Sequence, residues 1–219
     1  MKQIVQVKLQ PTPEQFSALK STLDSCNRAA TATSRVAFDL GATKQKITGE
    51  ALQRAAYQSV KEMGLSAQPA IHACRKVAGA YATLRSNLRN GNYGRPGSRR
   101  RISVESKPIV FRSEAAQPFD DRCLSWQYGE SGGTVSIWTV AGRLKGIPFV
   151  GHEDHLKLLQ ARRQGETDLV IRNGKVFLIA TVEVPESPMN MPQTVGWAWT
   201  WGSSTWQQLL TGIMLSAAR

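Results

Sequence analysis

A break in the hydrophobic pattern at residues 90–98 limits the folds open to this chain. The segment reads NGNYGRPGS, and its three glycines and one proline oppose the continuation of a helix. Before it, apolar residues recur mainly at helical spacing; after it, they occur in short runs and alternations that are typical of strands. The sequence therefore predicts a mostly helical part, a flexible basic joint and a β-rich part.

Local signals divide the first part into one strand and three helices. Residues 2–10 alternate apolar and polar, which predicts a strand. Thr12-Pro13-Glu14-Gln15 then carries a hydroxyl at the N-cap position, proline at the first helical position and Gln15 at the third, which predicts a helix start. The expected helices run from there to about Leu40, where Gly41 stops the first, and then over residues 49–63 and 67–88.

Short strands are expected in the second part. The apolar runs that predict them are residues 109–111, 124–128, 134–140, 147–150, 168–172 and 176–184. Asn173-Gly174 separates the last two and is the strongest hairpin signal in the chain. Residues 152–163 fit either a short helix or a loop. This order predicts an α+β fold in which the first strand joins the later antiparallel sheet and the helices form an insertion.

Charge is the first indication of a partner. Lysine and arginine number 28 against 16 acidic residues, which gives a net charge of +12 and an isoelectric point near 10.1. Between Arg75 and Arg112 there are ten basic residues and one acid, Glu105, so this segment carries nine of the twelve net charges. A solvated surface usually mixes the two signs, so we expect a nucleic acid as the partner rather than an ordinary basic loop.

The candidate nucleic-acid contacts fall in three groups. Phosphate contacts are expected from the third helix, from the basic segment that follows it, and from the residues after the turn at 139–142: Arg75, Lys76, Arg85, Arg89, Arg95, Arg99, Arg100, Arg101, Arg143 and Lys145. Tyr81 and Tyr93 are candidates for stacking on bases or ribose. For Tyr81 the core interpretation is the stronger one, because it lies among Val77, Ala78 and Leu84. Ordinary surface charge is nearly as good an explanation for Arg143 and Lys145.

No signal peptide or membrane span is expected, since no apolar run approaches about 18 residues, and the chain is expected to be cytoplasmic. Cys26, Cys74 and Cys123 are far apart and odd in number, which favours buried thiols over a disulfide or a zinc pair. His152 and His155 lack a nearby third ligand, so no metal is predicted in the chain. No nucleophile or phosphate-loop motif is present, so the chain is expected to be catalytically silent.

Four stretches together resemble the TnpB (OrfB) family of insertion-sequence proteins, relatives of the type V CRISPR effectors. They are, in order, VQVKLQPTPEQFSALKSTLDSCNRAA, LSAQPAIHACRKVAGAYATLR, SIWTVAGRLKGIPFV and GETDLVIRNGKVFLIATVEVPE. The resemblance implies a barrel-like β wedge domain interrupted by a three-helix recognition domain. The implied boundaries are 1–10 for the first wedge strand, 11–90 for the recognition domain, 91–107 for a basic linker, 108–186 for the wedge and 187–219 for a linker and tail.

The tail is where the chain departs from the family pattern. After the last wedge strand the family carries Gly-x-Asp-x-Gly, whose aspartate binds the catalytic metal of a RuvC-type nuclease, but residues 195–206 read VGWAWTWGSSTW. Tryptophan has the single codon TGG, so reading from the last base of the Trp197 codon gives glycine, an aliphatic residue, aspartate, an aliphatic residue and glycine. We therefore interpret residues 197–219 as out of frame, against the alternative of an in-frame tryptophan-rich strand or membrane-interface segment.

The resemblance implies a nucleic-acid-binding front part of an RNA-guided DNA endonuclease that lacks its nuclease. Its expected partners are a guide RNA from the transposon end, target DNA with an adjacent motif, and an intact copy of the protein. The magnesium ions and structural zinc of the family would belong to the missing region. Two alternatives stay open, a nuclease-less RNA-guided regulator and a recoded product that restores the full endonuclease. Sequencing the gene downstream of residue 219 separates them.

Overall fold

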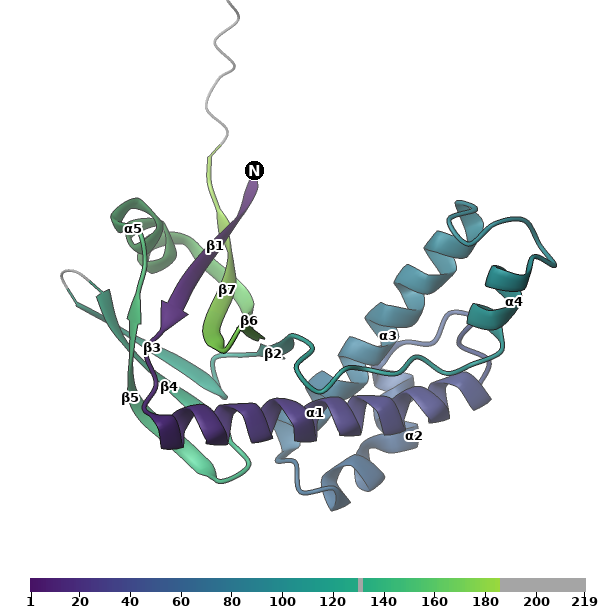
Figure 1. Cartoon of the computed structure of the whole chain (residues 1–219), viewed down its shortest axis with the longest axis horizontal. Helices are drawn as coiled ribbons and strands as arrows, with labels where there is room; N and C mark the ends of the chain where they lie inside the picture. The colour runs from purple at the N-terminus through teal and green to yellow at the C-terminus, as the bar shows by residue number, and fades with distance from the viewer. Residues whose placement is uncertain (130–131, 186–219) are drawn as a thin grey trace, which may run out of the picture. The chain divides into compact units, whose positions relative to one another are not determined.

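A computed structural model describes residues 1–129 and 132–185, which form an α+β fold (Figure 1). The interpretation of residues 197–219 as out of frame lies outside the described residues. The helices in the described part are α1 Pro13–Asp39, α2 Gly49–Glu62, α3 Ala67–Arg89, α4 Arg99–Glu105 and α5 Glu153–Arg162. The strands are β1 Lys2–Leu9, β2 Gln117–Phe119, β3 Leu124–Gly129, β4 Gly132–Thr139, β5 Gly142–Val150, β6 Arg163–Arg172 and β7 Lys175–Glu183. All of them belong to one unit, Lys2–Val184.

The described strands form one curled antiparallel sheet of seven strands in the order β2-β6-β7-β1-β5-β4-β3 (Figure 1). β1 is central: it pairs with β7 from Lys2↔Glu183 to Lys8↔Phe177, and with β5 at Leu9↔Phe149. The prediction that the first strand joins the later sheet is therefore confirmed. Four helices lie between β1 and β2 in the sequence. In β1, β4 and β7 alternate residues are buried, as expected for strands with one face on a core.

The turn chemistry of the sequence fixes the ends of several elements. The predicted helix start at Thr12 is a capping box: the Gln15 backbone N–H donates to Thr12 Oγ1 at 3.3 Å, and Thr12 N–H donates to Gln15 Oε1 at 3.0 Å. Gly41, with φ of 79°, follows the end of α1. In the β6–β7 hairpin, Asn173 and Gly174 have φ of 51° and 70°, and the flanking Arg172 and Lys175 pair.

Two groups of buried apolar side chains stabilise the fold. One lies inside the curled sheet and includes Val5, Val7 and Leu9 of β1, with Leu19 and Leu23 from the start of α1. The other lies among α1, α2 and α3 and contains small residues, leucines and Tyr81. α1 contributes to both groups, so this single helix couples the packing of the sheet to the packing of the helices.

Two predicted elements differ from the structure, and one short strand was missed. Residues 109–111, predicted as a strand, are not one; the N–H of Ile109 donates to Tyr81 Oη at 3.4 Å and that of Phe111 to Thr31 Oγ1 at 3.1 Å, so side chains of helices replace a sheet partner. Part of the expected flexible linker is helix α4, which begins at the N-cap residue Ser98. The three-residue strand β2 was not predicted.

Candidate nucleic-acid interface

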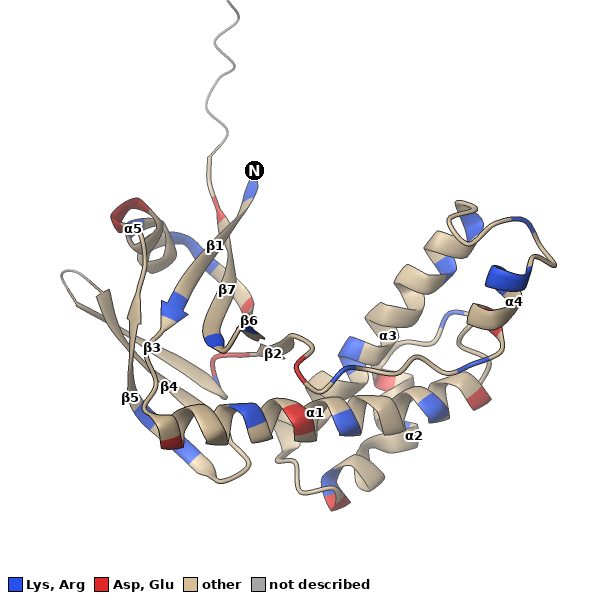
Figure 2. Cartoon of the chain, in the orientation of Figure 1, with Lys and Arg blue, Asp and Glu red and all other residues tan. Residues whose placement is uncertain are grey.

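Three segments bring basic side chains to one open cleft of about 610 Å³. They are the loop after α1, the C-terminal half of α3 and helix α4. The cleft is lined by five basic residues, Lys44, Lys46, Arg85, Arg89 and Arg101, and by one acidic residue, Glu105. Arg85, Arg89 and Arg101 were predicted contacts, whereas Lys44 and Lys46 were not. Figure 2 marks lysine and arginine positions in blue along the ribbon, several of them at the end of α3 and on α4.

Helix α3 places Arg85 and Arg89 one turn apart on the same face. Arg85 is partly buried and its Nη1 donates to the carbonyl oxygen of Ala42 at 2.7 Å, which fixes the guanidinium against the loop after α1. Arg89 lies in the last turn of the helix and is exposed. Basic residues are favourable there because the helix dipole leaves partial negative charge at its C-terminus.

Arg101 is held on the opposite wall of the cleft. Its backbone N–H donates to Ser98 Oγ at the start of α4. Its side chain forms an ion pair with Glu105, with Nε and Oε1 2.9 Å apart, and Nη1 donates to the carbonyl oxygen of Leu88 at 3.5 Å. These bonds orient the guanidinium and neutralise part of its charge.

The basic residues of the turn between α3 and α4 and of the first turn of α4 are more open. Arg95, Arg99 and Arg100 are exposed, and none has an acidic partner among residues 1–129 and 132–185. The Arg100 guanidinium carbon lies 5.5 Å from the ring centroid of Tyr93, a cation–π contact that occupies one face of this partly buried ring. The arginines therefore form an exposed positive surface beside the cleft.

Lys76 lies at a different place, in a cage of oxygen atoms. Its Nζ donates to Asn27 Oδ1 at 2.5 Å, to the carbonyl oxygen of Ala116 at 2.6 Å and to Gln117 Oε1 at 3.5 Å. Burial lowers the pKa of this ammonium to about 8, although the neighbouring Cys26 and Asp168 act in the opposite direction. The geometry gives Lys76 the role of an anchor between α3 and the segment before β2.

Tyr81 belongs to the helical core. Only 1% of it is exposed, its hydroxyl donates to the carbonyl oxygen of Ser34 at 3.0 Å, and the same hydroxyl accepts the Ile109 N–H. Because the side chain is buried, it has no ring face open for stacking on a base.

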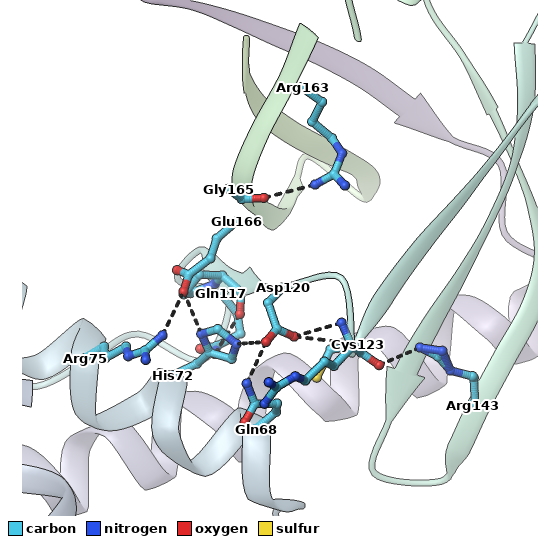
Figure 3. A network of polar contacts seen from close by, with 12 residues as sticks. Gln68, His72, Arg75, Gln117, Asp120, Cys123, Arg143, Arg163, Gly165 and Glu166 are labelled. Atoms are coloured by element: carbon cyan, nitrogen blue, oxygen red, sulfur yellow. Dashed lines mark hydrogen bonds and ion pairs between the residues drawn. The ribbon is translucent and has the colours of Figure 1, made fainter. Parts of the chain in front are cut away.

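Arg75 takes part in a polar network between α3 and the sheet (Figure 3). At its centre is His72, which is completely buried; Nδ1 lies 3.2 Å from Glu166 Oε1, and Nε2 lies 3.6 Å from Asp120 Oδ2. Arg75 Nη1 approaches the same Glu166 oxygen at 3.4 Å, and Gln68 donates to Asp120 at 2.6 Å. Through Gln68 and Arg75 the network joins α3 to Asp120, which follows β2, and to Glu166 of β6. Both ring nitrogens of His72 are buried without a hydrogen bond to the described residues, so His72 contributes close contacts with the two carboxylates.

Local structure places the two carboxylates of this network. Glu166 lies where the pairing of β6 with β7 shifts register between Gln164 and Thr167, an irregularity that re-aims side chains. Asp120 follows β2 and accepts the backbone N–H groups of Arg122 and Cys123. Partial burial raises the pKa of Asp120, but the bond from Gln68, the nearby His72 and these N–H groups outweigh it and lower the pKa.

The predicted contacts on the sheet lie on β5. Arg143 Nη2 donates to the carbonyl oxygen of Arg122 at 2.8 Å, and both Arg143 and Lys145 are exposed. Neither residue lines the cleft between α3 and α4.

Within residues 1–129 and 132–185, no group of three or more His, Cys, Asp and Glu side chains could hold a metal ion. None of the helices in that part of the chain is both long enough and apolar enough to cross a membrane. Neither a scan against models of known protein families nor a search of curated proteins found a match.

Proposed function

We propose that the chain binds RNA and DNA backbones through the basic surface of α3, α4 and the turn between them, as a TnpB-like guide-RNA-binding and target-DNA-binding part. The observation that carries the proposal is the set of exposed arginines Arg95, Arg99 and Arg100, which lack acidic partners among the described residues. Unpaired surface charge of one sign is favourable when a polyanion neutralises it and releases condensed counterions. Guanidinium groups also match the geometry of phosphate oxygens.

The resemblance to the TnpB family supports a guide RNA and its DNA target as the particular ligands. One structural feature agrees with that resemblance: β1 joins the sheet formed by the C-terminal strands. The recognition role of the helices and the wedge role of the sheet are parts of this proposal. Backbone shape and charge, rather than base edges, would then carry most of the binding.

The test is a gel shift with transposon-end RNA, using a variant with Arg95, Arg99 and Arg100 all changed to alanine. A matched control removes three exposed basic residues elsewhere, at Arg54, Lys61 and Lys175. We expect the first variant to bind about ten- to hundredfold more weakly than the parent at low salt, and the control to lose much less. Equal losses in the two variants would show that only net charge matters, and no binding by the parent would reject the proposal.

A further inference from the structure

The cleft between the loop after α1, α3 and α4 concentrates more positive charge than its surroundings neutralise. Five basic side chains line it, and Glu105 is the one acidic residue among the lining residues. The side chains of Lys44, Lys46 and Arg89 make no hydrogen bond or ion pair with the part of the chain that the structure describes. Converging like charges repel one another, so the arrangement is stabilised when an anion occupies the cleft.

The size of the cleft limits what that anion can be. A volume of about 610 Å³ lies within the range of small-ligand sites, about 300–1,000 Å³. Such a space holds one compact group rather than a length of double helix. The exposed Arg95, Arg99 and Arg100 do not line the cleft, so an extended backbone that contacts them and a compact group inside the cleft are different parts of a nucleic acid.

Two of the three guanidinium groups that line the cleft, those of Arg85 and Arg101, are preorganised. Arg85 donates one hydrogen bond to the carbonyl oxygen of Ala42, and Arg101 donates one to Glu105 and one to the carbonyl oxygen of Leu88. An arginine has five N–H donors, so each group keeps donors for a ligand while its orientation is fixed. Side chains that are held before binding lose less conformational entropy when the ligand arrives. Paired N–H donors of this kind bind phosphate oxygens in bidentate fashion.

We propose that this cleft binds a phosphate group with two or more negative charges, either the terminal phosphate of a nucleic-acid strand or a free oligophosphate. Five cations and one carboxylate leave four uncompensated charges, which a single internal phosphodiester cannot balance. Lys44, Lys46 and Arg89 supply the mobile charges, and Arg85 and Arg101 supply the fixed donors. The strand-end form of the proposal rests on the proposed nucleic-acid function; the oligophosphate form does not.

The first experiment uses inorganic tripolyphosphate, titrated into the full chain by isothermal calorimetry. We expect binding with one ligand per chain, weakened at least about tenfold when Lys44, Lys46 and Arg89 are changed to alanine. All three are exposed, so the variant should fold. The variant that lacks Arg54, Lys61 and Lys175 should bind like the parent. Absent binding, several ligands per chain, or equal loss in both variants would overturn the proposal.

The second experiment separates the two sources of phosphate. A fluorescent RNA is compared with the same RNA carrying a terminal monophosphate. If the phosphorylated RNA binds more tightly to the parent, and this preference disappears when Lys44, Lys46 and Arg89 are changed to alanine, the ligand is a strand end. Equal binding of the two RNAs, with tripolyphosphate still bound, identifies a free oligophosphate. RNA binding without any preference and without tripolyphosphate binding rejects the cleft proposal alone. Tripolyphosphate binding without RNA binding rejects the proposed function alone.

Discussion

Replacing Lys76 with methionine tests whether this residue anchors the fold or contacts phosphate. The ammonium is held by Asn27 Oδ1 at 2.5 Å and Ala116 O at 2.6 Å, and burial lowers its pKa from 10.5 to about 8. In the unfolded chain the side chain keeps its proton to about pH 10.5, whereas in the folded chain it releases the proton above about pH 8. Between these values the unfolded chain binds more protons, so the free energy of unfolding rises with pH.

The size of this effect follows from the two pKa values. From about pH 7 to about pH 9.5, the shift adds about 2 kcal/mol to the free energy of unfolding of the parent. The K76M variant lacks the titrating group and does not gain this contribution. Burial raises the pKa of Cys26 and Cys123 to about 12, which lowers stability as pH rises, but both thiols are present in both proteins and largely cancel in the difference.

Urea denaturation followed by circular dichroism at the two pH values, with a reducing agent, measures the effect. The stability of the parent relative to K76M should increase by about 2 kcal/mol at the higher pH. A difference that stays constant, or that shrinks as pH rises, would refute the assignment of Lys76 as a buried ammonium. K76M should also leave the salt dependence of RNA binding unchanged. A reduction in that salt dependence like the one expected when Arg95, Arg99 and Arg100 are changed to alanine would make Lys76 a phosphate contact.

Three substitutions and one thiol-reactivity measurement test the fold further. Thr12→Ala removes the capping box of α1 and should lower the free energy of unfolding, measured by urea denaturation, by about 1 kcal/mol. An unchanged free energy of unfolding would contradict the cap. Tyr81→Phe deletes a buried hydroxyl with two backbone partners and should cost about 1–2 kcal/mol by the same assay, whereas a neutral result would argue against those bonds. His72→Ala empties a completely buried site between two carboxylates and should lower stability by about 2–4 kcal/mol; a smaller cost than that of Thr12→Ala would contradict its role as a joint. The thiol of Cys26, buried and with its pKa raised to about 12, should react with a disulfide reagent at the rate of global unfolding, and rapid reaction in the native state would contradict its burial.

The elements that the sequence predicts well are those with strong local signals. The Thr12 cap, the helical spacing up to Gly41 and the Asn173-Gly174 turn each act over a few residues, so β1, α1 and the β6–β7 hairpin form where they are expected. Helix α4 was missed because its first residues are three consecutive arginines beside a glycine-rich segment, with no apolar spacing to indicate a helix. β2 has three residues, too few for an alternating pattern.

The candidate interface could be predicted only in part, because charge is visible in a sequence and position is not. The basic segment from Arg75 to Arg112 was evident, but its members have different surroundings: Lys76 is caged, Arg75 joins the His72 network, and Arg89 is exposed. Lys44 and Lys46 carried no signal of their own. They line the cleft because the loop after α1 lies against α3 and α4, a tertiary contact that local spacing does not encode.

The most direct test of nucleic-acid binding by this basic surface is the salt dependence of affinity for single-stranded transposon-end RNA, measured by fluorescence anisotropy. Each phosphate that a basic residue neutralises contributes about 0.7 to the slope of log K against log salt. Changing Arg95, Arg99 and Arg100 to alanine should therefore make the slope shallower by about 2, while changing Arg54, Lys61 and Lys175 should leave it near that of the parent. An affinity that does not depend on salt, or a slope that the two variants reduce equally, would contradict the proposed interface.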